Sequence, residues 1–340
     1  MSRQAALAAL CGTAALFAAA PALAAGPSLA VSPSSSAFST SGSTVLRFSD
    51  DGLDPTATLD VYSPVGYGAD LSQPFGSTIG GVDAQAKTIA GADVRLAGAI
   101  RSVDPAGYTQ AAAVCTPGRL VHDAVWTLAL NGEGLSLSRL PVFVDRAAAG
   151  TSLRACFPQP GSAGFEIRLT RATLTLNGIF TNPAASGEYR WTSMFTTYSV
   201  PGTPPSESQT LVRLPPRLTL ARKLIHASRH RTFVKVSGSL SEYGRAVRGV
   251  RVEVLSGPSV STLGRLAYAT SFTGGKFAVV APLRAKTVFR ARVAVPLREG
   301  PLSQCLPFSL RPDAICTRLT LAPFSAQSPT LTASPSRRWR

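Results

Sequence analysis

The sequence predicts an all-β protein, with two β-sandwich (Ig-like) domains after an N-terminal signal peptide. The first observation is composition: among 340 residues there are 29 Gly and 26 Pro, while 15% are charged and 7% are aromatic. These proportions favour short strands joined by tight turns. The second is a series of short runs in which apolar and polar residues alternate, as in half-buried strands. The third is that no capped amphipathic helical pattern of useful length occurs.

Residues 1–24 have the three parts of a secretory signal peptide. Arg3 supplies the positive start, 5–20 form an apolar run, and Ala22-Leu23-Ala24 is a small-residue cleavage box. The run is shorter than the roughly 20 residues of a membrane-spanning helix. We therefore expect a secreted or envelope protein whose mature chain has no transmembrane segment. Lipid attachment at Cys11 is disfavoured, because this cysteine lies inside the apolar run and not after it.

Residues 25–200 are predicted to form the N-terminal β-sandwich domain. The clearest strand spans 124–130, where the even-numbered residues, Trp126 among them, are apolar and share one face. Residues 131–134, Asn-Gly-Glu-Gly, then predict a hairpin turn. Gly98 interrupts the alternation of 94–100 and marks a bulge or a weak point. The glycine-rich stretch 63–92 has weak periodicity, so we expect long loops there.

A Pro-rich linker is predicted at 201–216, because prolines cluster at both of its ends. The charge changes at the same place. Residues 1–216 carry 13 basic and 14 acidic side chains, and residues 217–340 carry 21 and 4, so the net charges of −1 and +17 sum to +16. We therefore expect two folding units. The second is a basic Ig-like domain at 217–325, followed by a disordered basic tail at 326–340.

The second domain carries a pattern of valines and glycines. Val250, Val252 and Val254 alternate with polar residues after Gly249, and Gly275 with Phe277 ends a later hairpin. This pattern resembles the carboxypeptidase-regulatory-like and bacterial Ig-like β-sandwich modules of secreted proteins, over about 230–295. The resemblance implies a spacer or binding platform and no particular activity. The hairpin lacks the family's frequent Asp, which argues against a calcium role. The N-terminal domain resembles no family that we identify.

Four cysteines remain after removal of the signal peptide: Cys115, Cys156, Cys305 and Cys316. An even number in an oxidising compartment predicts disulfides. Three pairings are possible, and we favour Cys115–Cys156 with Cys305–Cys316 because each pair lies within one charge-defined domain. Metal binding is disfavoured because neither pair has the C-x-x-C spacing of a zinc site.

The excess of basic residues permits two interpretations. Arginine accounts for 29 of the 34 cations, which GC-rich codon usage explains, and this interpretation is preferred because the cations are spread along the strands. The alternative is attraction to an anionic envelope polymer or lipid surface. The candidate anion contacts are then Arg337, Arg338 and Arg340 in the tail. Secretion argues against a nucleic acid partner.

No catalytic, cofactor-binding or metal-binding motif stands out. His122 and Asp123 are adjacent in a predicted strand and face opposite sides, so we expect His122 to be a structural residue near Trp126. His226 and His230 have the spacing of a helical zinc motif, but they lack its Glu and its helix. The acidic turn 50–54 lacks the calcium-loop pattern. Four aromatic residues could line a carbohydrate-binding face but are more typical of a core: Trp126, Tyr189, Trp191 and Tyr198.

Together these observations predict a secreted, non-enzymatic protein of the cell envelope or its surroundings that acts as a structural or binding module. One alternative is a carbohydrate-binding protein or enzyme with its site in the N-terminal domain. The other is a binder of anionic envelope polymer or lipid through the basic C-terminal domain.

Overall fold

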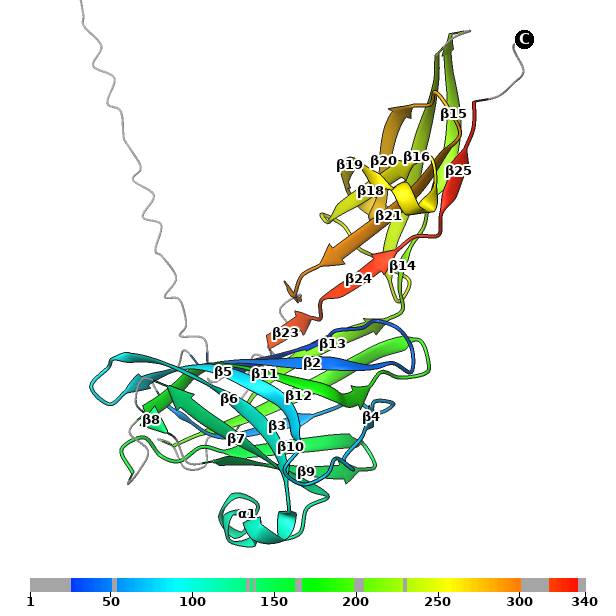
Figure 1. The fold of residues 1–340 in the computed structure, drawn as a ribbon. Coiled ribbons are helices and arrows are strands. Elements are labelled where there is room, and N and C mark those ends of the chain that lie inside the picture. The colour runs from blue at the N-terminus through cyan, green and yellow to red at the C-terminus, as the bar shows by residue number, and fades with distance from the viewer. Residues whose placement is uncertain are drawn as a thin grey trace, which may run out of the picture.

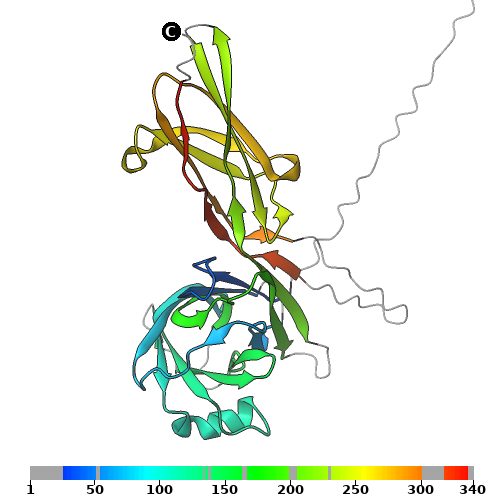
Figure 2. The same ribbon diagram turned by 90° about the vertical axis from the view of Figure 1, so that its right-hand side faces the viewer.

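The computed structural model describes residues 26–50, 54–132, 135–136, 139–162, 167–198, 205–228, 231–300 and 318–335. Two bodies, each built of strands around its own hydrophobic core, lie end to end (Figures 1 and 2). The all-β prediction is therefore confirmed. No helix among the described residues is long and apolar enough to span a membrane. The predicted signal peptide lies outside the described residues.

One large sheet builds the N-terminal body. Its strands are β1 (Ser28–Pro33), β2 (Ser41–Ser49), β3 (Thr56–Tyr62), β4 (Gly68–Ala69), β5 (Thr78–Thr88), β6 (Asp93–Val103), β7 (Ala124–Gly132), β8 (Leu135–Ser136), β9 (Leu140–Ala147), β10 (Gly150–Cys156), β11 (Ile167–Thr181), β12 (Gly187–Thr197), β13 (Ser206–Leu214), β22 (Arg298–Glu299) and β23 (Arg318–Leu321). Their spatial order is β1-β2-β11-β5-β6-β7-β9-β10-β3-β12-β13-β23-β22, with β4 beside β11 and β8 beside β7.

The sheet curls until its first strand meets β13. The backbone N–H of Leu29 donates to Ser208 Oγ (2.9 Å), and the N–H of Val31 donates to Thr210 Oγ1 (3.0 Å). Side-chain hydroxyls thus satisfy backbone donors of β1 that no strand pairs. The closed sheet encloses the first core, whose largest buried side chains include Trp126, Trp191 and Phe195.

Strand β7 shows how sequence alternation places the core. Trp126 and Leu128 point into the closed sheet, at 1% and 6% exposed, as the alternation predicted. Val125, on the opposite face, is also buried at 1%. The reason is a second layer outside the sheet, made of a 3-10 turn, η1 (Pro105–Tyr108), and a short helix, α1 (Thr109–Cys115). Ala112 and Cys115 of α1 cover Val125 and form a small satellite core with it.

The expectation of long loops over 63–92 was wrong, because β5 occupies Thr78–Thr88. Its glycines replace the side chains that would have shown the alternation. A Cβ on Gly80 would lie 2.0 Å from the carbonyl oxygen of Thr175 in the neighbouring strand β11. On β6, a Cβ on Gly98 would lie 1.5 Å from the carbonyl oxygen of Ala129. These glycines are therefore required by the close approach of strands.

Two sheets pack face to face in the C-terminal body. Their strands are β14 (Pro216–Leu218), β15 (Ala221–Ser228), β16 (Arg231–Glu242), β17 (Arg245–Ala246), β18 (Arg251–Gly257), β19 (Gly264–Thr270), β20 (Lys276–Pro282), β21 (Thr287–Val295), β24 (Phe324–Gln327) and β25 (Leu331–Ala333), with 3-10 turns η2 (Val260–Thr262) and η3 (Thr273–Gly275). Strand β16 pairs with β14 and β15 on one side and with β17 and β20 on the other. The second sheet has the order β19-β18-β21-β24, with β25 also on β21.

The valine pattern of this body behaves as predicted. Val252 and Val254 are fully buried between the two sheets, while Arg251 faces solvent. Gly275 has a φ of 69°, a left-handed value that favours glycine, and Phe277 then enters the core at 1% exposed.

The predicted segment boundaries need three corrections. The linker 201–216 contains β13, which pairs with β12 from Ser206 to Leu214. The C-terminal domain 217–325 contains β22 and β23, which belong to the sheet of the N-terminal body, β23 pairing in parallel with β13. The tail 326–340 contains β25, which pairs with β21 and buries Ala333 completely. A strand at 210–214 was expected, but β13 is longer and belongs to the sheet of the N-terminal body. Strands β22, β23 and β25 were missed because each has at most four residues, too few to show an alternation.

Candidate functional site

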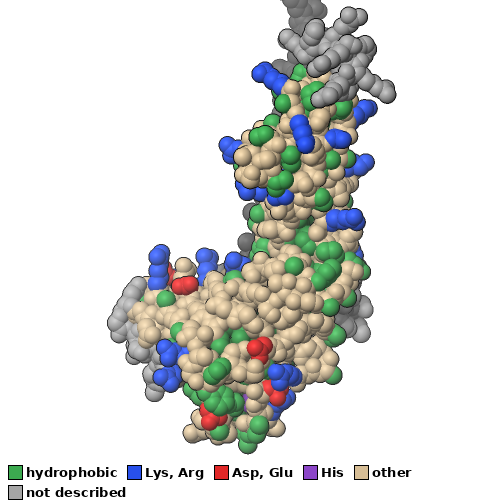
Figure 3. Space-filling view, turned by 45° about the vertical axis from the view of Figure 1, so that its right-hand side comes forward, with side chains coloured by type: hydrophobic (Ala, Val, Ile, Leu, Met, Phe, Trp, Pro, Cys, Tyr) green, Lys and Arg blue, Asp and Glu red, His purple; other side chains and the backbone are tan. Residues whose placement is uncertain are grey.

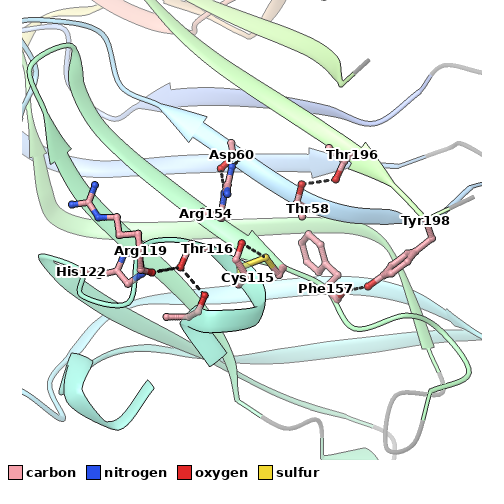
Figure 4. The surroundings of a disulfide bond; sticks show 12 residues. Thr58, Asp60, Cys115, Thr116, Arg119, His122, Arg154, Phe157, Thr196 and Tyr198 are labelled. Carbon is pink, nitrogen blue, oxygen red and sulfur yellow. Dashed lines mark hydrogen bonds and ion pairs between the residues drawn. A yellow bond between two sulfur atoms is a disulfide. The ribbon is translucent and has the colours of Figure 1, made fainter. Parts of the chain in front are cut away.

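A disulfide between Cys115 and Cys156 joins the end of α1 to the end of β10 (Figure 4). The two Cα atoms are 5.7 Å apart, and 41 positions separate the residues in the chain. The predicted pairing is therefore present. By the entropy of loop closure, a cross-link of this span stabilises the fold by about 4 kcal/mol. Cys305 and Cys316 lie outside the described residues, so their pairing stays a prediction.

A hydrogen-bonded series of Thr116, His122 and Asp145 lies beside the disulfide. His122 Nδ1 is 2.9 Å from Asp145 Oδ2, and His122 Nε2 is 3.0 Å from Thr116 Oγ1. The imidazole is 1% exposed. Asp145 also binds Arg119, whose Nη2 lies 2.9 Å from Asp145 Oδ1. The order hydroxyl, imidazole, carboxylate is that of a nucleophile, a base and an orienting acid.

The surroundings of Thr116 favour a structural clamp. Its Oγ1 lies 2.9 Å from the carbonyl oxygen of Ala112 and 2.8 Å from that of Arg119, besides the imidazole. A nucleophilic oxygen needs an open approach, whereas three partners surround this hydroxyl in a residue that is 8% exposed. The series therefore ties the turn after α1 to Asp145 on β9, as Figure 4 shows for Thr116, Arg119 and His122.

The prediction that His122 does not pair with Asp123 is confirmed, since its carboxylate partner is Asp145. Its neighbouring ring is Phe143, with ring centroids 4.6 Å apart, and not the expected Trp126. The sequence gives no local signal for the pairing of His122 with Asp145, because Asp145 lies 23 positions later. The two residues come together only because β7 pairs with β9. His226, considered above as part of a helical zinc motif, lies on strand β15 and not on a helix, so that motif is excluded. His230 lies outside the described residues.

The aromatic residues considered for a carbohydrate face do not form one together. Trp126 and Trp191 are 1% and 0% exposed, inside the first core. Tyr189 and Tyr198 each donate a hydroxyl to a backbone carbonyl, that of Ala185 and Phe157 respectively. The core also holds a cavity of about 50 Å³ lined by apolar side chains.

The acidic turn has a structural role at its described end. Asp50 is 1% exposed and accepts hydrogen bonds from the N–H and the hydroxyl of Thr56, at 3.1 and 2.9 Å. Residues 51–53 lie outside the described part of the chain. Among the residues that are described, no group of three or more His, Cys, Asp or Glu side chains is placed to hold a metal ion.

The junction between the two bodies is short and charged. Leu214 belongs to the first core and Leu218 to the second, and likewise Ala322 to the first and Phe324 to the second. The chain also runs from Val295 in the second core to β22 in the first sheet. In the described chain, three connections therefore join the bodies at one place, where β13, β14, β23 and β24 meet in Figure 1.

Ion pairs cross this junction. Arg245 of β17 places its Nε 2.9 Å from Glu188 of β12, which also binds Arg213. Glu242 of β16 binds Arg298 of β22 at 2.8 Å, with its side chain 2% exposed. Burial raises the pKa of the Glu242 carboxyl, and the Arg298 bond opposes that shift only in part. The junction is therefore held both by the three chain connections and by ion pairs between the two bodies.

No protein-family model and no curated protein matches the sequence. Among solved structures, domains D2 and D3 of the major pilin SpaD from Corynebacterium diphtheriae are 10% identical, with 78% of this chain and 82% of that chain covered and a TM-score of 0.25. The full-length SpaD pilin is 9% identical, with 88% and 67% covered and a TM-score of 0.26. A β-1,2-glucanase from Parabacteroides distasonis is 9% identical, with 92% and 37% covered and a TM-score of 0.16.

TM-scores this low establish neither a shared topology nor a shared function. The comparisons therefore do not identify the carboxypeptidase-regulatory-like or bacterial Ig-like family for 230–295, and that resemblance stays a prediction.

Proposed function

We propose that the protein is a non-enzymatic structural module of the cell envelope or its surroundings, in which the junction holds the basic C-terminal body in a constant position relative to the N-terminal body. The observation that carries this proposal is the triple connection between the bodies. A single linker permits one body to swivel against the other. Three connections at one place restrict that motion. In addition, residues 208–211 of β13 pair in parallel with residues 318–321 of β23.

Three further features support this proposal. The signal-like sequence of residues 1–24 is consistent with export. The net charge of +17 in residues 217–340 would suit an anionic partner outside the cell. The disulfide Cys115–Cys156 is of the kind that persists in oxidising compartments.

Small-angle X-ray scattering of the mature chain tests this function. We expect the measured profile to fit one arrangement of the two bodies. A matched pair of variants sharpens the test. Arg245→Ala with Arg298→Ala removes the junction ion pairs, whereas Arg222→Ala with Lys223→Ala removes the same charge from the exposed strand β15. We expect only the first pair to broaden the distance distribution.

A wild-type profile that requires an ensemble of bent and extended forms would overturn the proposal. Equal broadening by both pairs of substitutions would also overturn it, because the effect would then come from net charge and not from the junction.

A further inference from the structure

The outward face of the sheet β19-β18-β21-β24 carries a cluster of arginines around one tyrosine. Arg251 and Glu253 point outward from β18, Tyr268 from β19 and Arg292 from β21, while the residues between them face the core. Strand register places Glu253 opposite both Tyr268 and Arg292. Four residues from three strands therefore form one continuous surface.

Tyr268 holds two of the arginines in position. The guanidinium carbon of Arg251 lies 3.6 Å from the centre of the Tyr268 ring, and that of Arg265 lies 5.2 Å from it. Arg265 Nη1 also donates to the Tyr268 hydroxyl at 3.0 Å. Stacking of this kind orients an arginine without neutralising it. The cations are thus ordered before any ligand arrives, which lowers the entropy lost on binding.

The positive charge of this face is only partly compensated. Arg292 binds Glu253, which keeps the pKa of that carboxyl below its usual value. No carboxylate among the described residues lies within ion-pair distance of Arg251 or Arg265. In Figure 3, the acidic side chains in view lie on the N-terminal body, whereas the charged side chains in view on the C-terminal body are those of Lys and Arg. The guanidinium N–H groups of Arg251 are therefore available to an external anion.

A shallow hollow lies beside these cations. It has a volume of about 590 Å³, and its polar lining consists of Arg251, Tyr268 and Arg292, of Glu253, which is paired with Arg292, and of Ser325 and Gln327 of β24. Ser325 and Gln327 are exposed and offer hydroxyl and amide groups that can exchange hydrogen bonds with sugar hydroxyls. The hollow thus combines arginine guanidinium groups, which can bind anionic oxygens through paired N–H groups, with neutral polar groups.

We infer that this Arg–Tyr face, defined by Arg251, Arg265, Tyr268, Arg292, Ser325 and Gln327, binds a linear polysaccharide that carries carboxylate groups. The guanidinium forks of Arg251 and Arg265 bind the carboxylates, and Ser325 and Gln327 contact the sugar hydroxyls. This inference rests on the proposed location in the envelope, but it does not depend on the stiffness of the junction.

Other anionic partners fit this face less well. Nucleic acid bases bind flat on open aromatic rings, whereas Arg251 already covers a face of the Tyr268 ring. An anionic membrane is bound most firmly where apolar side chains project beside the cations. Here the outward neighbours are the small or polar residues Ala294, Ser325 and Gln327. A carboxylated glycan matches both the charges and the polar lining.

Titration of the mature chain with polygalacturonate at about 50 mM salt tests the inference, because charges at this ionic strength are weakly screened. Dextran, phosphatidylglycerol vesicles and duplex DNA are the comparison ligands. We expect saturable binding of polygalacturonate alone. Arg251→Ala with Arg265→Ala should weaken it at least tenfold, and Arg251→Lys with Arg265→Lys should weaken it less, because lysine keeps the charge but loses the fork.

The matched control is Arg284→Ala with Lys286→Ala, which removes the same charge from the exposed turn before β21. We expect this control to change the affinity by less than about threefold. An equal loss in the control would overturn the inference, since binding would then follow net charge alone. Absence of polygalacturonate binding would overturn it as well. So would binding of DNA or vesicles as tight as that of polygalacturonate, if this binding also requires Arg251 and Arg265. Unchanged circular dichroism would show that each variant is folded, and an unchanged scattering profile would separate this result from the test of the junction.

Discussion

Removal of the Cys115–Cys156 disulfide should destabilise the N-terminal body without unfolding it. The substitution Cys115→Ala with Cys156→Ala removes a cross-link that spans 41 positions. Loop-closure entropy then predicts a loss of about 4 kcal/mol in the free energy of unfolding. For a body of this size, each kcal/mol corresponds to about 2–4 °C. We therefore expect the melting temperature to fall by roughly 8–16 °C.

The folded structure should survive because other contacts hold the same region. Ala112 still packs with Val125 and Phe143, and the bond of His122 to Asp145 still ties the following turn to β9. The entropic loss therefore acts mainly through the unfolded chain. Hydrogen exchange should become faster in α1, while exchange in β21 of the C-terminal body should not change.

Differential scanning calorimetry of the wild type and the double variant measures the predicted shift. Val114→Ala is a matched control, since it changes the residue next to Cys115 at a position that is 83% exposed. This control should alter stability by less than about 0.5 kcal/mol. A double variant that melts within 2 °C of the wild type would refute the entropic reasoning. So would peptide mapping that finds free thiols at Cys115 and Cys156 in the exported protein.

Three further predictions follow from the described contacts. Gly98→Ala should lower the free energy of unfolding by about 2 kcal/mol or more in a denaturant titration, because the new Cβ would lie 1.5 Å from a backbone carbonyl oxygen. Gly81→Ala is the control and should be tolerated, because the nearest atom would be 3.6 Å away. Glu242→Gln should flatten the dependence of melting temperature on pH: a carboxyl whose folded-state pKa is raised contributes stability at low pH, and that contribution is lost as the pH rises through the raised value. An unchanged pH profile would contradict this. Cleavage by a protease within 201–205 should leave two fragments that co-elute on native gel filtration, because β13 of the second fragment stays paired with β12 of the first. Separate elution would show that this pairing does not hold the fragments together.

The sequence determined the features that depend on neighbours in the chain. Alternation at 124–130 and at 250–254 placed Trp126 and Val252 in cores, because successive side chains of a strand point to opposite faces. The even number of cysteines and their division between the charge-defined parts predicted the Cys115–Cys156 pair, and the charge count separated a basic C-terminal part from a nearly neutral N-terminal part.

Only the tertiary structure decided the features that depend on distant partners. Gly80 conceals a strand because a neighbouring backbone occupies the space of its missing side chain. The pairing of β13 with β23 joins segments about 110 positions apart, and no local pattern encodes such a register. The His122–Asp145 bond and the Arg–Tyr face arise in the same way. Each is made by side chains that only strand pairing brings together, and a pairing across the sheet leaves no periodicity in the sequence of either strand.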